Sequence, residues 1–255
     1  MTITNSETTF RKTESDRIHT FSEIWNRDID KVFANVAHYY DRANVVASLG
    51  LLSVWLKKFI STIDVHPGDK VLDVCAGTNV VGIALLKKQP DLDIQAIDRS
   101  EDMQRVGAER ATKRGFTIKS DIGDVHSLPY PDSHFDVVTL QYASRHLGIL
   151  QVGQEINRVL KPGGHFYHCD MLRPSNKLVE KAYYMYLKFC LNFTSWIFKS
   201  DEAALRCRTY FIDAIKMFYS AEELSDLLRS IDFVEVEHRT VFAGMVAFHK
   251  AMKAR

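Results

Sequence analysis

The sequence contains few cysteines, and their spacing fits neither a metal site nor a redox pair. Its 255 residues include four cysteines, Cys75, Cys169, Cys190 and Cys207, and none belongs to a Cys-x-x-Cys motif. A chain of this length can bury a sizeable hydrophobic core without disulfide cross-links. We therefore expect free thiols and a reducing, cytoplasmic setting.

The sequence also lacks an excess of charge of either sign. The 33 Lys and Arg residues oppose 32 Asp and Glu residues, which leaves a formal net charge of +1. A nucleic-acid partner would require a basic face or stripe, so this balance gives no reason to expect one. With 46% hydrophobic and 25% charged residues, the composition is that of a soluble globular protein, which excludes disorder, coiled coil and collagen as the main class.

No apolar run is long enough to cross a bilayer. The longest nearly apolar stretch, from Val45 to Leu56, falls well short of the about 20 residues that a spanning helix needs. The first thirty residues carry acidic side chains from Glu7 to Asp30 and no apolar signal-peptide segment, so we expect neither a secretory signal nor a transit peptide. A cytoplasmic protein is predicted, and contact with a membrane surface is left open.

From residue 70 onward, the hydrophobic pattern alternates between strand and helix periods. Strands are predicted near 70–77, 93–98, 116–124, 135–143 and 165–172, with a late hairpin at 234–241 and 244–253. Helices are predicted near 80–90, 100–115, 150–164 and 220–233, with Ser100 and Ser220 as N-caps and Glu223 in a capping box. This alternation predicts an α/β fold, with a Rossmann-like, seven-stranded, mostly parallel sheet and helices on both faces.

Two further segments are expected to form a helical cap. Residues 1–31 are predicted as an N-terminal extension, with a frayed start followed by an amphipathic helix. Residues 32–255 are assigned to the main domain, whose first part is helical with breaks around Asn44 and Gly50. An insert at about 172–218 follows the fifth strand and completes the cap.

Aromatic residues gather in that insert. Seven of the sixteen positions from Tyr183 to Phe198 are aromatic, whereas an even spread of the chain's 11% would give fewer than two. These residues occur on all sides of a helical wheel, which is more than one buried face requires. We favour a cap that lines an apolar substrate tunnel, and ordinary core packing is the alternative.

Acidic residues end three successive predicted strands. In an open parallel sheet, ligands bind outside the carboxyl ends of the strands, so Asp73, Asp98 and Asp124 should share one edge. Asp98 is suited to accept hydrogen bonds from both ribose hydroxyls, and Asp124 to meet an adenine amino group. Asp73 would repel a phosphate and favour a cation. Together they predict a site for an adenosine that carries a positive charge, although the loop at 73–82 could also be an ordinary strand-to-helix turn.

Five segments between Val32 and the C-terminus carry a family resemblance: VFANVAHYYDRAN, VLDVCAGT, HSLPYPDSHFDVVT, EINRVLKPGG and AGMVAFHKAMK. Through them the chain resembles class I S-adenosylmethionine-dependent methyltransferases, specifically the ubiquinone/menaquinone biosynthesis C-methyltransferase family. The resemblance implies S-adenosylmethionine as the cofactor. It implies cofactor contacts from Thr78, Asp98, Asp124, the backbone of Val125 and Gln141, with Asp73 and Gly77 shaping the loop.

The chain departs from the family pattern at three places. Asn79 replaces a glycine of the cofactor loop, and because Asn tolerates positive φ we expect the loop to keep its function. Cys75 replaces a small residue. The family's Arg-Asn pair after the fourth strand is Arg145-His146, in a loop that is one residue shorter. The last change concerns the identity of the substrate.

Three residues are candidates for catalysis. The resemblance places Tyr40 and Arg145 at the substrate, where Arg145 would stabilise a phenolate. His146 is predicted to act as a general base, since an unperturbed imidazole titrates near neutral pH. A surface-loop histidine and a packed aromatic helix are the alternatives for His146 and Tyr40. No metal is required, and the neighbouring His168 and Cys169 point to opposite faces of a strand, so we expect no metal site.

The predicted function is C-methylation of an apolar, prenylated aromatic or hydroquinone, such as a demethylated menaquinol or ubiquinol precursor. A methyltransferase acting on a prenylated or terpenoid natural product is the first alternative. A protein that binds S-adenosylmethionine without catalysis is a second one. A nicotinamide dehydrogenase should show a G-x-G-x-x-G loop, which this sequence lacks. Formation of a homo-oligomer is left open.

Overall fold

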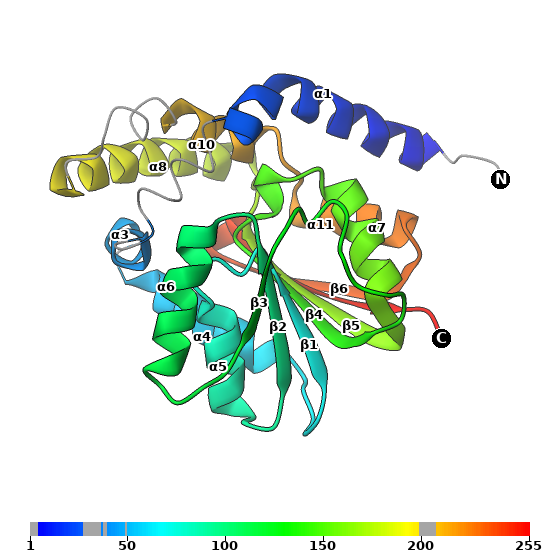
Figure 1. The fold of residues 1–255 in the computed structure, drawn as a ribbon. Helices are drawn as coiled ribbons and strands as arrows, with labels where there is room; N and C mark the ends of the chain where they lie inside the picture. The colour runs from blue at the N-terminus through cyan, green and yellow to red at the C-terminus, as the bar shows by residue number, and fades with distance from the viewer. Residues whose placement is uncertain (1–4, 28–36, 38–39, 49, 199–207) are drawn as a thin grey trace.

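The computed structural model describes residues 5–27, 37, 40–48, 50–198 and 208–255. Its centre is a seven-stranded sheet in the order β3-β2-β1-β4-β5-β7-β6 (Figure 1). The strands are β1 (Lys70–Val74), β2 (Asp93–Asp98), β3 (Lys119–Ile122), β4 (Phe135–Gln141), β5 (Leu160–Met171), β6 (Phe233–Val241) and β7 (Val246–Lys253). β7 runs antiparallel to both of its neighbours, β5 and β6, whereas β1 to β5 pair in parallel. The predicted mostly parallel sheet with a late hairpin is confirmed.

Successive residues of a strand face opposite layers of helices. Leu72 and Val74 of β1 belong to a core formed with α7 (Ile149–Val159) and α11 (Ala221–Ser230). The preceding Val71 belongs to a second core formed with α4 (Leu51–Thr62) and α5 (Val80–Lys88). Figure 1 shows α6 (Glu101–Thr112) on the same side of the sheet as α5. Both faces of the sheet are therefore covered, as the sequence predicts.

Two helices begin at the predicted serines. Ser100 Oγ accepts the Met103 N–H at 3.3 Å at the start of α6. At α11, Ser220 Oγ accepts the Glu223 N–H, and the Glu223 carboxylate accepts the Ser220 N–H at 2.8 Å. The break expected at Asn44 is wrong, because Asn44 lies inside α3 (Tyr40–Ala47), whereas Gly50, with φ of 81°, does precede α4.

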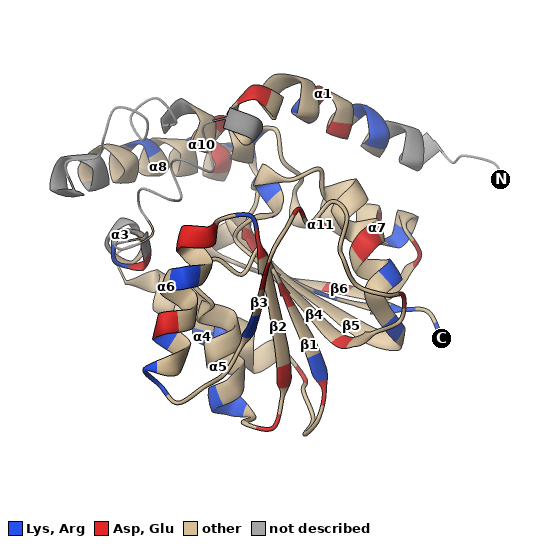
Figure 2. Cartoon of the chain, in the orientation of Figure 1, with Lys and Arg blue, Asp and Glu red and all other residues tan. Residues whose placement is uncertain are grey.

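The remaining helices cover the edge of the sheet where the parallel strands end (Figure 1). They are α1 (Asn5–Arg27), α8 (Lys177–Phe198) and α10 (Arg208–Lys216), beside α3. Phe21 and Trp25 of α1 pack with Tyr210 and Ala214 of α10 in a small core of their own. The N-terminal segment and the insert thus meet in one cap. Basic and acidic residues are interspersed along α1, α6 and α7, in keeping with the small net charge (Figure 2).

Arg17 joins this cap to the sheet. Its side chain is fully buried in α1 and donates to the carbonyl oxygens of Arg145 and Leu147 at 3.0 and 3.1 Å. Glu14, one turn earlier, pairs with the same guanidinium. A buried charge persists only when it is paired and hydrogen-bonded, so these contacts fix α1 against the segment that follows β4.

Candidate functional site

A cavity of about 560 Å³ lies at the carboxyl-terminal edge of the sheet, where the topology predicts a ligand. Much of its polar lining comes from the ends of strands: Cys75, Gly77 and Thr78 after β1, Asp98 and Ser100 at the end of β2, and Gln141, Tyr142 and His146 at the end of β4. Asp41 of α3 and Arg110 of α6 add charged groups. Its apolar lining comes from Val45 of α3, Leu52 and Leu56 of α4, and Ile83 of α5. No α8 residue that the structure describes lines it, so the expected aromatic tunnel is not formed by the described part of α8.

The loop between β1 and α5 turns through left-handed backbone conformations. Asn79 has φ of 56°, as its tolerance of positive φ predicts, and Gly77 has φ of 52°. Cys75 also has positive φ, at 54°, which its sequence gives no reason to expect. Burial, reinforced by the neighbouring Asp98 carboxylate, raises the pKa of the Cys75 thiol, so it stays protonated.

Asp98 is oriented by two backbone amides. Its Oδ2 accepts the Gly77 N–H at 2.8 Å, and its Oδ1 accepts the Ser100 N–H at 2.9 Å. These two contacts fix the direction of the Asp98 carboxylate. The predicted cofactor residues Gly77, Thr78 and Asp98 are therefore neighbours in the cavity wall.

Asp73 lies behind this wall and not in it. Its side chain is buried between β1 and β4, where Thr139 Oγ1 donates to Oδ1 at 2.7 Å. Burial raises the pKa of Asp73 to about 7. The Asp73 carboxyl group therefore supports the loop from within the sheet, and it does not line the cavity where a ligand would contact it.

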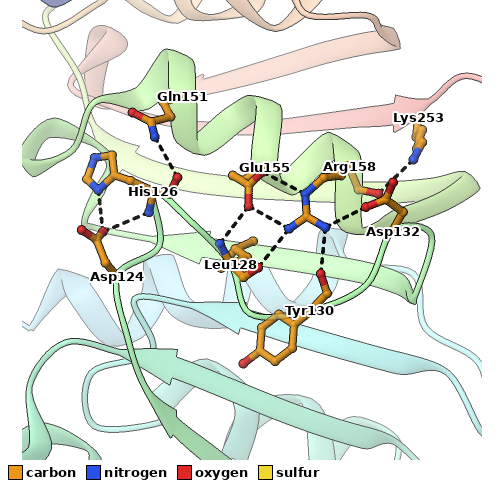
Figure 3. A network of polar contacts seen from close by, with 9 residues as sticks. All are labelled: Asp124, His126, Leu128, Tyr130, Asp132, Gln151, Glu155, Arg158 and Lys253. Carbon is orange, nitrogen blue, oxygen red and sulfur yellow. Dashed lines mark hydrogen bonds and ion pairs between the residues drawn. The ribbon is translucent and has the colours of Figure 1, made fainter.

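Asp124 turns away from the cavity, although Val125 lines it. The Asp124 carboxylate accepts the His126 N–H at 3.0 Å and faces the His126 Nδ1 at 2.6 Å (Figure 3). Partial burial opposes ionisation, but the hydrogen bonds from His126 hold the pKa of Asp124 below its usual value. The structure thus brings Val125, and not the Asp124 side chain, to the candidate site.

Arg158 of α7 fixes the segment that follows Asp124 (Figure 3). Its guanidinium donates to the carbonyl oxygens of Leu128 at 2.9 Å and Tyr130 at 2.7 Å, and it pairs with Glu155 and Asp132 at 2.8 Å each. Glu155 in turn accepts the Leu128 N–H at 2.8 Å. This role of Arg158 could not be predicted from the sequence, because Leu128, Tyr130 and Asp132 become its neighbours only in the fold.

His146 is buried at the cavity wall, with 8% of its surface exposed, which excludes a surface-loop histidine. Its Nδ1 meets the Tyr210 hydroxyl of α10, and that hydroxyl accepts the Trp25 Nε1–H of α1 at 2.7 Å. Burial, reinforced by the positive charges of Arg145 and Arg17, lowers the pKa of His146 well below 6.5. The imidazole is therefore neutral at physiological pH and can accept a proton.

Arg145 forms an ion pair with Asp170, which is fully buried at the end of β5. Its Nη1 also donates to the Tyr142 carbonyl oxygen at 3.1 Å, and Ser144 Oγ donates to Asp170 at 2.5 Å. The guanidinium is absent from the described lining of the cavity. The expected contact of Arg145 with a substrate thus remains a prediction.

Tyr40 opens α3, but its side chain lies outside the described residues. The next residue, Asp41, does line the cavity and accepts hydrogen bonds from Thr78 Oγ1 at 3.1 and 3.2 Å. Arg110 of α6 pairs with the same carboxylate. Sequence reasoning missed both residues, although Asp41 stands in the first segment that carries the family resemblance.

Gly107 is a further missed residue. A Cβ atom there would lie 2.8 Å from Asn79 Nδ2 and 2.9 Å from the Thr78 carbonyl carbon. Only glycine therefore lets α6 pack this closely against the β1–α5 loop. An isolated glycine inside an amphipathic helix was the available signal.

Among the residues that the structure describes, no group of three or more His, Cys, Asp or Glu side chains is placed to hold a metal ion. None of the described helices is both long and apolar enough to span a membrane.

Known proteins resemble the chain over most of its length. A model of the ubiE/COQ5 methyltransferase family matches residues 22–253. The demethylmenaquinone methyltransferase of Anoxybacillus flavithermus is 32% identical over 229 residues, which cover 88% of this chain and 95% of that protein. The ubiquinone/menaquinone biosynthesis C-methyltransferase UbiE of Teredinibacter turnerae is 30% identical and covers 88% of this chain and 90% of its own.

Solved structures resemble the fold at lower identity. A SAM-dependent methyltransferase from Thermotoga maritima gives a TM-score of 0.60 at 19% identity, covering 88% of this chain and 99% of that one. The [4+2]-cyclase SpnF gives the same TM-score of 0.60 at 17% identity, covering 78% of this chain and 80% of that one. Because a cyclase shares the fold, activity must be argued from sequence kinship and from the site.

Proposed function

The chain belongs to the ubiE/COQ5 methyltransferase family, and from this premise we propose that it methylates a ring carbon of an apolar, prenylated hydroquinone. It is an S-adenosylmethionine-dependent methyltransferase by family and fold. The relatives named for demethylmenaquinone methylation support a demethylated menaquinol or ubiquinol precursor as the acceptor. One observation carries the proposal: a neutral, buried histidine lines the same cavity as the Asp98 carboxylate.

The cavity fits the cofactor by the chemistry of its lining. Asp98, oriented by the Gly77 and Ser100 amides, is suited to accept both ribose hydroxyls. Val125 offers an apolar contact beside the end of β2, and Gln141 offers an amide. When bound, S-adenosylmethionine supplies an electrophilic methyl group on a sulfonium.

His146 is proposed as the general base. A neutral imidazole accepts the proton of a ring hydroxyl, and the oxygen's electron pair then raises electron density at the neighbouring ring carbon. The bound cofactor would supply the methyl group and would leave as a neutral thioether. The proton displaced from the ring carbon would pass to solvent, and the proton held by His146 would return to the ring oxygen. Arg145, held by Asp170, contributes a fixed positive charge beside this residue.

A prenylated natural product is the second candidate acceptor. The Arg145-His146 pair stands where the family has Arg-Asn, and the apolar wall formed by Leu52, Leu56 and Ile83 would accept hydrocarbon of either origin. Because His146 lines the cavity, where it could act as a base, it favours a catalyst over a protein that only binds the cofactor.

The same proposal includes contact of α8 with an anionic membrane surface, where such acceptors dissolve. Leu178, Met185 and Phe189 of α8 are 81%, 66% and 63% exposed, and their spacing places them on one helix face. Lys181 and Lys188 are exposed on the same helix and would meet anionic headgroups. Helix α8 packs against α3, which lines the cavity, so this face adjoins the proposed route of the acceptor.

The test is transfer of an isotope-labelled methyl group to a panel of demethylated quinols and prenylated phenols, with the product identified by mass. We expect a product with one added methyl on carbon for a quinol. Asp98→Ala should abolish cofactor binding, measured by calorimetry, whereas Asp93→Ala at the exposed start of β2 should not. Cofactor binding without transfer to any acceptor would overturn the enzymatic proposal.

A further inference from the structure

Three elements meet at one carboxylate on the cavity wall. Asp41 of α3 accepts hydrogen bonds from Thr78 Oγ1 of the β1–α5 loop, and Arg110 Nη1 of α6 donates to both Asp41 and Thr78, the latter at 3.1 Å. All three residues line the cavity. About a quarter of the Asp41 and Arg110 side chains is exposed, at 28% and 27%, so a ligand in the cavity can reach the cluster.

The Thr78 hydroxyl and the Arg110 guanidinium form a typical recognition pair for a carboxylate. Guanidinium groups bind carboxylates through charge-assisted hydrogen bonds, and a hydroxyl adds a neutral donor. Arg114, in the turn that follows α6, also lines the cavity and increases its positive charge at this end. The carboxylate of a ligand could therefore accept from the same two donors, Thr78 and Arg110, that now contact Asp41.

The position of this pair relative to Asp98 indicates which carboxylate it would bind. Thr78 follows Gly77, whose N–H contacts Asp98, so the acidic group suited to ribose and the basic pair adjoin the same loop. A ligand with adenosine at Asp98 and a carboxylate at its other end matches this polarity. S-adenosylmethionine has that arrangement, with its carboxylate on the methionine portion.

We propose that Thr78 and Arg110 recognise the methionine carboxylate of S-adenosylmethionine, and that Asp41 competes with it for the same two donors. The inference rests on the proposed cofactor. Two carboxylates at one hydroxyl repel each other, so binding of the ligand's carboxylate releases Asp41 from Thr78. Asp41 thereby lowers cofactor affinity and couples the position of α3 to occupancy of the loop.

The test compares S-adenosylmethionine with decarboxylated S-adenosylmethionine, which keeps the adenosine, sulfonium and amine. Affinities are measured by calorimetry on the full chain without acceptor. Arg110→Gln should weaken S-adenosylmethionine by about 10- to 100-fold, the loss typical of a charged hydrogen bond, and leave the decarboxylated analogue unchanged or tighter. Arg105→Gln, on the same helix but paired with Asp102 outside the cavity, is the matched control and should change neither affinity.

Asp41→Asn separates competition from a positioning role. Removal of the competing charge should tighten S-adenosylmethionine by about 3- to 10-fold, because Thr78 and Arg110 are then available in a larger fraction of molecules. Weaker binding would mean that Asp41 holds Arg110 in place, and it would overturn the proposed competition. If Arg110→Gln unfolds the chain, Thr78→Val provides the same comparison of ligands.

Two results distinguish a failure of carboxylate recognition from a failure of cofactor binding. Equal weakening of both ligands by Arg110→Gln would overturn carboxylate recognition while leaving the cofactor assignment intact. Failure of the unmodified chain to bind either ligand would instead contradict the cofactor on which the inference rests.

Discussion

At the scale of single residues, burial sets the chemistry of His146. A histidine whose pKa lies well below 6.5 keeps its basic form at all pH values above that lowered pKa. His146→Gln should leave cofactor affinity unchanged and lower kcat by about 10²- to 10⁴-fold, the usual contribution of a general base. Steady-state rates with a quinol acceptor and calorimetry with the cofactor separate the two effects.

The pH profile gives an independent check on the same residue. In the unmodified enzyme, the decrease of kcat on the acid side of the pH profile should lie well below pH 6.5, because protonation of His146 removes the proposed base. The His146→Gln variant should lose that decrease. A decrease that persists unchanged in the variant would assign the base to another group.

Asp73 links pH to stability with a definite sign. Its pKa is raised from 3.8 to about 7 by burial, so between these values the folded chain holds more protons than the unfolded one. Stability contributed by the neutral carboxyl is therefore lost as the pH rises towards 7. Asp73→Asn stays neutral, so its free energy of unfolding relative to the unmodified chain should rise by about 3 kcal/mol between pH 5 and pH 8. Urea unfolding at both pH values measures this, and a constant difference would contradict it.

At the scale of elements, the approach of α6 to the β1–α5 loop depends on Gly107. In an unobstructed helix, Gly→Ala stabilises by about 1 kcal/mol. Here the new methyl group would overlap Asn79 and Thr78, so Gly107→Ala should destabilise by about 1 to 3 kcal/mol and weaken cofactor binding. Gly153→Ala on α7 is the control. Its new methyl group would meet the flexible end of the Ile231 side chain, away from the cavity, so the variant should leave cofactor affinity unchanged.

Helix α8 carries the prediction for membranes. Replacing Met185 and Phe189 with Ser removes exposed apolar surface without touching the buried Tyr183 and Cys190. The double variant should bind vesicles of anionic phospholipid at least about 10-fold more weakly in a sedimentation assay, since buried apolar area drives interfacial binding. Unchanged binding of the double variant to the vesicles would contradict membrane contact through this face.

At the scale of the whole molecule, features with local causes could be predicted from the sequence. Alternating hydrophobic periods indicated the sheet, and Ser100 and Ser220 cap helices through residues only three positions away. Asn79 adopts a left-handed conformation for a reason that lies in its own side chain. The helix predicted over 150–164 ends already at Val159, because Leu160 pairs with Phe135 of β4 and residues 160–164 belong to β5.

Features that depend on distant partners could not be predicted. The family resemblance places Arg145 at the substrate, whereas its partner Asp170 becomes its neighbour only when β5 pairs with β4. The same holds for Asp41 and Arg110, which come from helices separated by two strands along the chain. Residues at strand ends, such as Asp98 and Gln141, could thus be expected at the cavity from the sequence, but not which charged residues neutralise one another.

The contact between Trp25, Tyr210 and His146 has a consequence for the order in which the enzyme becomes competent during synthesis. Trp25 leaves the ribosome early, and Tyr210 follows 185 residues later. The strands on either side of the cofactor loop, β1 and β2, also leave the ribosome before Tyr210. The environment of His146 is completed only after α10 has emerged. The part of the cavity wall that holds His146 is therefore synthesised completely only after the part that holds Asp98.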